Sequence, residues 1–164
     1  MSLSRSIKMG LRPIIIPILR LFKYFELQTY YVEGDGGNLS HHKTARLANT
    51  LFNVESGSIS IGENTIFGYN VMVLTGMHQY KAGKRLSVFL SENNHKVNTG
   101  VEVPRSGHDI EIGKNCWIAS GVIIVGNVRI GDSVIVMGGS VVTKDIPDNT
   151  IAGGVPAKSI KDNI

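Results

Sequence analysis

Apolar residues recur at every sixth position in two blocks of the chain, residues 61–78 and 112–147. Neither the 3.6-residue period of an amphipathic helix nor the two-residue alternation of a half-buried strand produces this spacing. Self-similarity at a fixed period is typical of repeat architectures, in which stacked units share one continuous core. The positions at which the repeats start are all apolar: Ile61, Phe67, Val73, Ile112, Ile118, Ile124, Ile130, Val136 and Val142.

The third residue after each repeat start is Gly, Asn or Asp in eight of the nine repeats, and Ser133 is the exception. Gly, Asn and Asp tolerate the left-handed backbone conformation with positive φ. The fourth residue after each start is small or medium-sized and mostly apolar, as at Cys116 and Met77. A chain that runs a short strand, turns through a left-handed residue and repeats every six residues winds a prism. Three repeats then close one coil.

The pattern predicts an all-β fold, a parallel β-helix over residues 38–164 in which stacked coils bury a column of Ile and Val. A β-meander is the alternative, but its hairpins impose periods of about 8–12 residues and no fixed residue phase. Residues 38–60 are expected to form a degenerate coil with Leu47 and Leu51 as apolar positions. Residues 79–109 abandon the repeat, so we expect them to project as a loop, and long ordered loops usually have a function.

Residues 1–37 are expected to form a basic and apolar helical segment ahead of the prism. The net charge of +4 is concentrated there, because residues 1–25 hold five basic residues and no acidic one. Residues 26–164 hold 12 basic and 13 acidic residues, which argues against a general nucleic-acid-binding surface. Two alternatives stay open for residues 1–25: packing against the prism, or peripheral contact with an anionic membrane.

The cellular compartment is predicted from the cysteine content and the apolar runs. The single cysteine excludes an internal disulfide framework and favours a reducing compartment. The longest apolar stretch, Ile14–Leu19, is far shorter than the roughly 20 residues that a membrane-spanning helix needs. We therefore expect a cytoplasmic protein, with the inner face of the membrane as a possible peripheral location.

Four segments carry a resemblance to a known family: Thr75–His78 (TGMH), Ile110–Ile118 (IEIGKNCWI), Ile130–Pro147 (IGDSVIVMGGSVVTKDIP) and Ile151–Lys158 (IAGGVPAK). With the nine repeats, they resemble the hexapeptide-repeat acyltransferases, which fold as a left-handed parallel β-helix. The similarity is to the maltose, galactoside and nodulation-factor O-acetyltransferase branch and to acetyltransferases of polysaccharide clusters. It implies a homotrimer with an active site between neighbouring prisms, acetyl-CoA as the donor and no metal.

Transfer from an already activated thioester needs a base for the acceptor and stabilisation of a developing oxyanion. A neutral imidazole suits the first role, because its ordinary pKa is about 6.5. His78 ends the first regular block and matches the catalytic histidine of the family, so it is the predicted general base. For the acceptor, the resemblance and the insertion indicate Asn49 or Asn53, together with Arg85 and His108.

The resemblance also implies a set of donor-binding residues. It places Trp117 beside the active-site tunnel. Small residues on successive coils would let the pantetheine arm of CoA approach the backbone. The lysines are candidates for contact with the CoA phosphates. The set comprises Trp117, Ala119, Ser120, Gly138, Gly139, Thr143, Lys144, Pro156, Lys158 and Lys161.

The predicted function is transfer of acetyl from acetyl-CoA to a saccharide or glycoconjugate hydroxyl, directly and without an acyl-enzyme. An N-acetyltransferase of an amino sugar, an antibiotic acetyltransferase and a non-catalytic trimeric scaffold are the alternatives. The γ-type carbonic anhydrases share the prism but need three histidines converging on zinc. The spacing of His78, His95 and His108 does not match that need.

Overall fold

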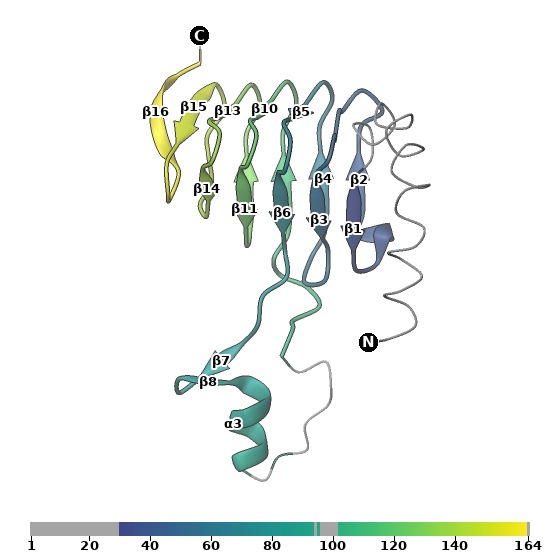
Figure 1. Ribbon diagram of the computed structural model, residues 1–164, viewed down its shortest axis with the longest axis vertical. Coiled ribbons are helices and arrows are strands. Elements are labelled where there is room, and N and C mark those ends of the chain that lie inside the picture. The colour runs from purple at the N-terminus through teal and green to yellow at the C-terminus, as the bar shows by residue number, and fades with distance from the viewer. Residues whose placement is uncertain (1–29, 94, 96–101, 164) are drawn as a thin grey trace, which may run out of the picture.

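The computed structural model describes residues 30–93, 95 and 102–163, which form a three-sided prism of short strands with one projecting arm (Figure 1). Most of the expected N-terminal helical segment lies outside these residues. The sheets are stacked as in a left-handed β-helix, and each forms one face of the prism, here called faces A, B and C. Face A has the order β1-β3-β6-β11-β14, face B the order β12-β9-β4-β2, and face C the order β16-β15-β13-β10-β5.

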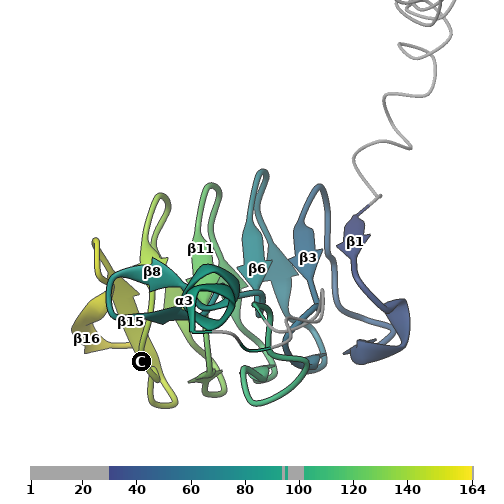
Figure 2. The same cartoon turned by 90° about the horizontal axis from the view of Figure 1, so that it is seen from below.

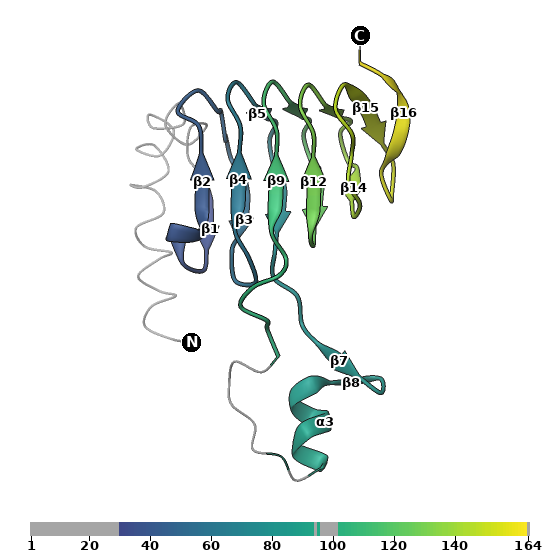
Figure 3. The same ribbon diagram turned by 180° about the vertical axis from the view of Figure 1, so that it is seen from behind.

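The strands of all three faces are two to five residues long. Those of face A are β1 Tyr31–Glu33, β3 Leu51–Asn53, β6 Met72–Leu74, β11 Ile123–Val125 and β14 Val141–Val142. Those of face B are β2 Leu39–His41, β4 Ile59–Ile61, β9 Ile110–Ile112 and β12 Val128–Ile130, which lie side by side in Figure 3. Those of face C are β5 Ile66–Phe67, β10 Trp117–Ile118, β13 Ile135–Val136, β15 Thr150–Gly153 and β16 Lys158–Asp162.

The six-residue apolar period builds the core, as predicted. All nine repeat starts are buried, and they stack in register from coil to coil, as in Ile61 beside Ile112 and Ile112 beside Ile130. Cys116 is also buried, and its thiol donates to the Gly131 carbonyl at 3.0 Å. Burial raises the pKa of the Cys116 thiol above its ordinary value. The expected column of Ile and Val is therefore confirmed.

The expected left-handed turns form at two corners of the prism but not at the third. The third repeat residue has a positive φ at six positions: Asn64, Asn70, Asn115, Gly121, Ser133 and Gly139. The expectation is wrong at Gly76, Asn127 and Asp145, all of which follow face A. At one of these three positions the positive φ is displaced by one residue, from Asn127 to Gly126.

The first coil starts earlier than expected and carries a different core residue. β1 pairs in parallel with β3, so residues 31–33 belong to face A rather than to a helical segment. Phe52, not Leu51, occupies the buried position and stacks on Val73. From the buried Leu47 to Phe52 the chain advances five residues, one fewer than in the regular repeat, and this shift turns Leu51 outward.

Residues 79–109 form the arm, which leaves the prism after β6 and returns at β9 (Figures 1 and 3). Figure 2 shows β8 and α3 of the arm from below. The arm contains more order than a loop: the hairpin strands β7 (Tyr80–Lys81) and β8 (Lys84–Arg85) lead into helix α3 (Leu86–Glu92). The chain already departs from the core at Met77, which is 44% exposed although the repeat predicts an inward position.

The last strand differs from all the others in the stack. β16 runs antiparallel to β15, and its five residues are exposed. β16 therefore covers the edge that β15 would otherwise leave open on face C. No helix among the residues that the structure describes is long and apolar enough to cross a membrane.

Candidate active site

His78 lies where face A meets the arm, shortly after the end of β6. Its side chain is 63% exposed and lines a hollow of about 290 Å³. The hollow is built from the first coil, the rim after β6 and the returning arm, so three separate segments meet at the predicted base. Its lining residues are Glu33, Asn53, Glu55, Gly76, Met77, His78 and Val103.

Of the two asparagines predicted to contact an acceptor, the structure brings Asn53 to His78. The Asn53 side-chain oxygen accepts from the backbone N–H groups of Gly76 at 2.9 Å and Glu55 at 3.3 Å. Its amide nitrogen donates to a carboxylate oxygen of Glu33 at 3.2 Å. Asn49 instead lies at the corner between faces C and A, where its amide donates to Asn70. The orientation of the Asn53 amide is therefore fixed by three contacts.

Glu102 is a residue of the site that the sequence reasoning missed. One of its carboxylate oxygens, Oε2, lies 3.9 Å from Nδ1 of His78 and 3.7 Å from Nη1 of Arg85. The other oxygen, Oε1, accepts a short hydrogen bond from the Ser87 hydroxyl. The Ser87 bond, aided by the charges of Arg85 and His78 and opposed by desolvation, lowers the pKa of Glu102 below its ordinary value of 4.5. Glu102 is therefore an anion beside the predicted base.

The other two predicted acceptor residues do not line the hollow. Arg85 is engaged with Glu102 from the arm side, as described above. His108 lies just before β9, where its backbone N–H donates to the Ser56 carbonyl at 3.2 Å. The neighbouring Asp109 fastens this return of the arm, since its carboxylate accepts from the Ser58 backbone at 2.7 Å and the Ser58 hydroxyl at 2.8 Å.

Four of the predicted donor-binding residues, on successive coils, gather at the corner between faces C and A. The Gly139 N–H donates to the Ser120 carbonyl at 3.0 Å, so the two turns lie directly on one another. An added Cβ on Gly138 would lie 3.1 Å from the same carbonyl, which shows how closely the backbones approach. The four residues are Ala119, Ser120, Gly138 and Gly139.

The remaining donor residues occupy face C and the last coil. Trp117, on β10, points outward between Ile66 and Ile135 of the neighbouring strands and is 49% exposed. Thr143 and Lys144 follow β14, and Pro156, Lys158 and Lys161 belong to the β15–β16 turn and to β16. Within one chain, Trp117 therefore lies on a different face from the strand that leads to His78.

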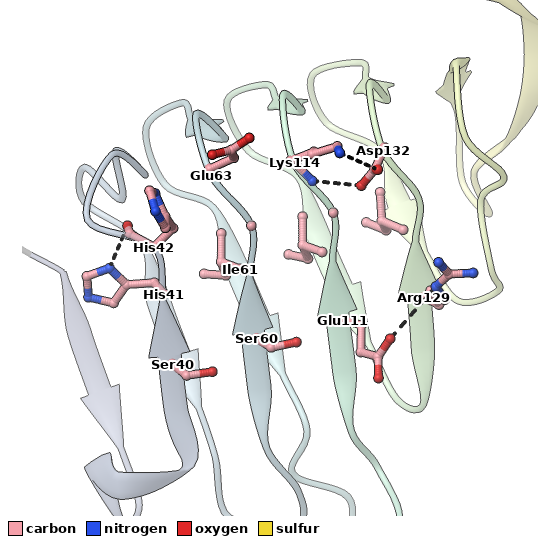
Figure 4. A pocket seen from close by; sticks show the side chains of 14 residues that line it. Ser40, His41, His42, Ser60, Ile61, Glu63, Glu111, Lys114, Arg129 and Asp132 are labelled. Carbon is pink, nitrogen blue, oxygen red and sulfur yellow. Dashed lines mark hydrogen bonds and ion pairs between the residues drawn. The ribbon is translucent and has the colours of Figure 1, made fainter.

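A larger groove of about 630 Å³ crosses face B, away from His78 (Figure 4). The small outward side chains of Ser40 and Ser60 leave space at one end. At the other end, charges are paired: Arg129 lies 3.8 Å from Glu111, and Lys114 lies 3.7 Å from Asp132. None of the predicted site residues lines this groove. In the part of the chain that the structure describes, no group of three or more His, Cys, Asp or Glu side chains is arranged to hold a metal ion.

Comparison with known proteins identifies the family. A family model described as "Bacterial transferase hexapeptide (six repeats)" matches residues 109–144. The galactoside O-acetyltransferase of Escherichia coli (strain K12) is 31% identical over 139 residues, which cover 85% of this chain and 60% of that protein. The solved structure of a maltose O-acetyltransferase from Clostridium difficile 630 is 32% identical, with a TM-score of 0.55, and the match covers 82% of this chain and 67% of that one. The chain belongs to the hexapeptide-repeat acetyltransferase family.

A second solved structure supports the branch within the family. A galactoside acetyltransferase in complex with coenzyme A is 30% identical, with a TM-score of 0.62, and the match covers 82% of this chain and 60% of that one. Together with the maltose O-acetyltransferase structure, it places the chain in the galactoside/maltose O-acetyltransferase branch of the family. The chain spans between 42% and 60% of the length of three curated relatives that it matches.

Proposed function

We propose that the protein transfers the acetyl group of acetyl-CoA to a hydroxyl of a saccharide or glycoconjugate. The hollow shared by His78 and Asn53 carries this proposal, because it joins a candidate base to an oriented amide beside open space. Membership of the galactoside/maltose branch supports both the donor and the acceptor class.

His78 is the general base in this proposal. Its Nδ1 is turned toward the Glu102 carboxylate, so a proton on Nδ1 leaves Nε2 free to accept the proton of the acceptor hydroxyl. The acceptor oxygen then forms a bond to the acetyl carbonyl carbon, the carbon–sulfur bond breaks, and the proton held by His78 passes to the departing thiolate. Glu102 stabilises the imidazolium that exists between the two proton transfers. Asn53 holds the acceptor through its remaining amide hydrogen.

We further propose that the chain acts as a homotrimer, in which His78 of one copy meets Trp117 of the next. Face B carries polar and charged outward side chains, whereas faces A and C carry apolar outward side chains that are only partly covered within one chain. Two apolar faces on each copy suit a closed ring in which face A of one chain packs near face C of another. The outward apolar residues are Leu51, Met72, Ile123 and Val141 on face A, and Ile66, Trp117, Ile135 and Ile151 on face C.

Turnover of acetyl-CoA against a panel of monosaccharides, nucleotide sugars and lipid-linked glycans tests the proposal. A product acetyl group that hydroxylamine removes is an ester, which separates O-acetylation from N-acetylation. His78→Ala should lower kcat by about 10²–10⁴-fold, the usual contribution of a general base, with little change in the Kd for acetyl-CoA. His95→Ala, on the exposed part of the arm, is the matched control.

Two results would contradict the proposal. Absence of acetyl-CoA binding at millimolar concentration would favour a non-catalytic scaffold. Wild-type turnover by His78→Ala would exclude the base. Sedimentation of the chain tests the trimer. Salt-sensitive flotation with anionic vesicles, lost on deletion of residues 1–25, would favour membrane contact over packing for that segment, which lies outside the described residues.

A further inference from the structure

Three segments of the chain meet on the Glu102 carboxylate. The rim contributes His78, and the arm contributes Arg85 at the end of β8 and Ser87 in the first turn of α3. Backbone hydrogen bonds brace the same junction, since Gln79 donates to the Glu102 carbonyl at 2.8 Å and Leu86 donates to the Gln79 carbonyl at 2.8 Å. The Glu102 side chain is only 18% exposed. The arm and the base are therefore connected through one carboxylate.

The two oxygens of Glu102 are used differently. Oε1 accepts from the Ser87 hydroxyl, which fixes the carboxylate on the arm without competing with His78. Oε2 lies between two cationic or potentially cationic groups, 3.7 Å from Arg85 and 3.9 Å from His78. Because Arg85 and His78 approach the same oxygen, a closer contact of Oε2 with one of them weakens its electrostatic interaction with the other.

We propose that Arg85 and Ser87 are positioning residues. Their contacts with the Glu102 carboxylate determine how strongly this carboxylate interacts with His78, and thereby set the proton affinity of the His78 imidazole. This inference rests on the proposed role of His78 as the base. Ser87 holds the carboxylate in place through Oε1, which favours a proton on His78. The positive charge of Arg85 partly neutralises the Glu102 carboxylate and also repels a protonated imidazole, so it disfavours protonation of His78. In this arrangement the Glu102 carboxylate stays close enough to His78 to stabilise the imidazolium.

Opposite effects of two neighbouring substitutions follow from this arrangement. Ser87→Ala releases Oε1, so the pKa of His78 should fall. Arg85→Gln frees Oε2 and removes a positive charge, so the pKa of His78 should rise. Each change should be about half a pH unit, as expected for partly exposed charges about 4 Å apart. Loss of arm structure alone would move the pKa in one direction for both variants. The other titratable side chains that line the hollow, Glu33 and Glu55, are unchanged in both.

The experiment is an NMR titration of the 164-residue chain with isotope-labelled histidine, in which the His78 signal is assigned by its loss in His78→Gln. Lys84→Gln is the matched control, because Lys84 lies beside Arg85 but pairs with Glu92 at 2.5 Å, away from Glu102. It should leave the pKa of His78 unchanged. In a Glu102→Gln background, Ser87→Ala should also have no effect, since its action passes through the carboxylate.

Shifts of the same sign for Ser87→Ala and Arg85→Gln, or shifts equal to that of Lys84→Gln, would overturn the inference. The titration needs no substrate, so it gives its answer even if the protein transfers no acetyl group and the proposed function fails. Where turnover is measured, the acid limb of kcat/KM should move with the NMR pKa in each variant. If the acid limb of the kcat/KM profile does not move although the pKa of His78 shifts, His78 is not the base. This result would contradict the proposed function but not the proposed roles of Arg85 and Ser87.

Discussion

The side-chain oxygen of Asn53 accepts the backbone N–H of Gly76 at 2.9 Å, and so ties the first coil to the rim that carries His78. The contact crosses from β3 to the chain just after β6, over 23 positions of sequence. Thr75 reinforces it, because its backbone N–H and its hydroxyl both donate to the Asn53 carbonyl, at 3.0 and 2.9 Å. Asn53 is thus a structural part of the rim as well as the proposed acceptor contact.

Asn53→Asp should raise the acceptor KM at least about tenfold and change kcat less. The aspartate keeps an oxygen for Gly76, but it has no amide hydrogen for the acceptor and places a second negative charge beside Glu33. Steady-state kinetics at saturating acetyl-CoA measure both constants. Asn49→Gly is the control, because it removes a side chain at another corner and keeps a residue that tolerates the local φ of 48°. Equal effects of the two variants would argue against contact between Asn53 and the acceptor.

Gly76→Ala should lower activity by displacing the Asn53 amide. A Cβ at position 76 would lie 2.5 Å from the Asn53 oxygen, which forces the side chain to move and breaks its bond to the rim. We expect kcat/KM for the acceptor to fall about tenfold, the equivalent of one lost hydrogen bond of about 1.4 kcal/mol. Gly36→Ala provides the comparison, since no atom lies within 4 Å of a Cβ there. Unchanged kinetics of Gly76→Ala would mean that the Asn53 orientation is not needed.

Acid should weaken the attachment of the arm through Asp109. The two hydrogen bonds from Ser58 hold the pKa of Asp109 below its ordinary value of 3.8. A lowered pKa in the folded state stabilises the fold above the unfolded-state value, and this contribution is lost as the pH falls through the folded-state value. Asp109→Asn should therefore melt about 2–4 °C below the wild type at pH 7 and approach it below pH 4. Thermal melts across this range, with Asp162→Asn as control, measure the difference; a gap independent of pH would contradict the assignment.

Ser133→Asn should stabilise the prism. Ser133 has a φ of 55°, nearly the value of 56° that asparagine takes at positions 64, 70 and 115. Asparagine tolerates this left-handed conformation better than serine, so the replacement should raise the melting temperature by about 1–4 °C. Ser133→Ala keeps the unfavourable φ without the polar side chain, and it should melt at or below the wild-type temperature. A lower melting temperature for Ser133→Asn would show that neighbouring packing, not φ, limits this turn.

The regular part of the fold is predictable because one period fixes several properties at once. Each repeat start must be apolar, since it points into a column shared by all coils, and this constraint is visible from Ile112 to Val142 without any knowledge of partners. The same reasoning fails in the first coil, where a step one residue shorter moves the buried position from Leu51 to Phe52. It also fails at the corner after face A, where the positive φ moves to Gly126 in one coil and is absent at Gly76, whose backbone N–H donates to Asn53.

Only the site residues that adjoin the regular six-residue repeat could be predicted from the sequence. His78 ends a regular block, so its place on the rim follows from the period and the TGMH motif. The choice between Asn49 and Asn53 depended on the phase of an irregular coil, which spacing alone does not determine. Glu102 lies 24 positions after His78 in a segment with no period, and its contact with the rim depends on how the arm folds back. Such a contact leaves no signal in a single sequence.

The antiparallel β16 has a consequence for colloidal behaviour. In a stack of parallel coils, the last coil leaves backbone N–H and C=O groups unpaired, and a further coil could pair with them just as each earlier coil pairs with the next. Left open, that edge would accept a coil from another molecule and grow into a fibre. β16 runs opposite to the other strands of face C and carries the charged side chains Lys158, Lys161 and Asp162, which disfavours the addition of a further parallel strand to this face. The strand that carries two predicted phosphate contacts, Lys158 and Lys161, therefore also protects the edge of face C against association with other molecules.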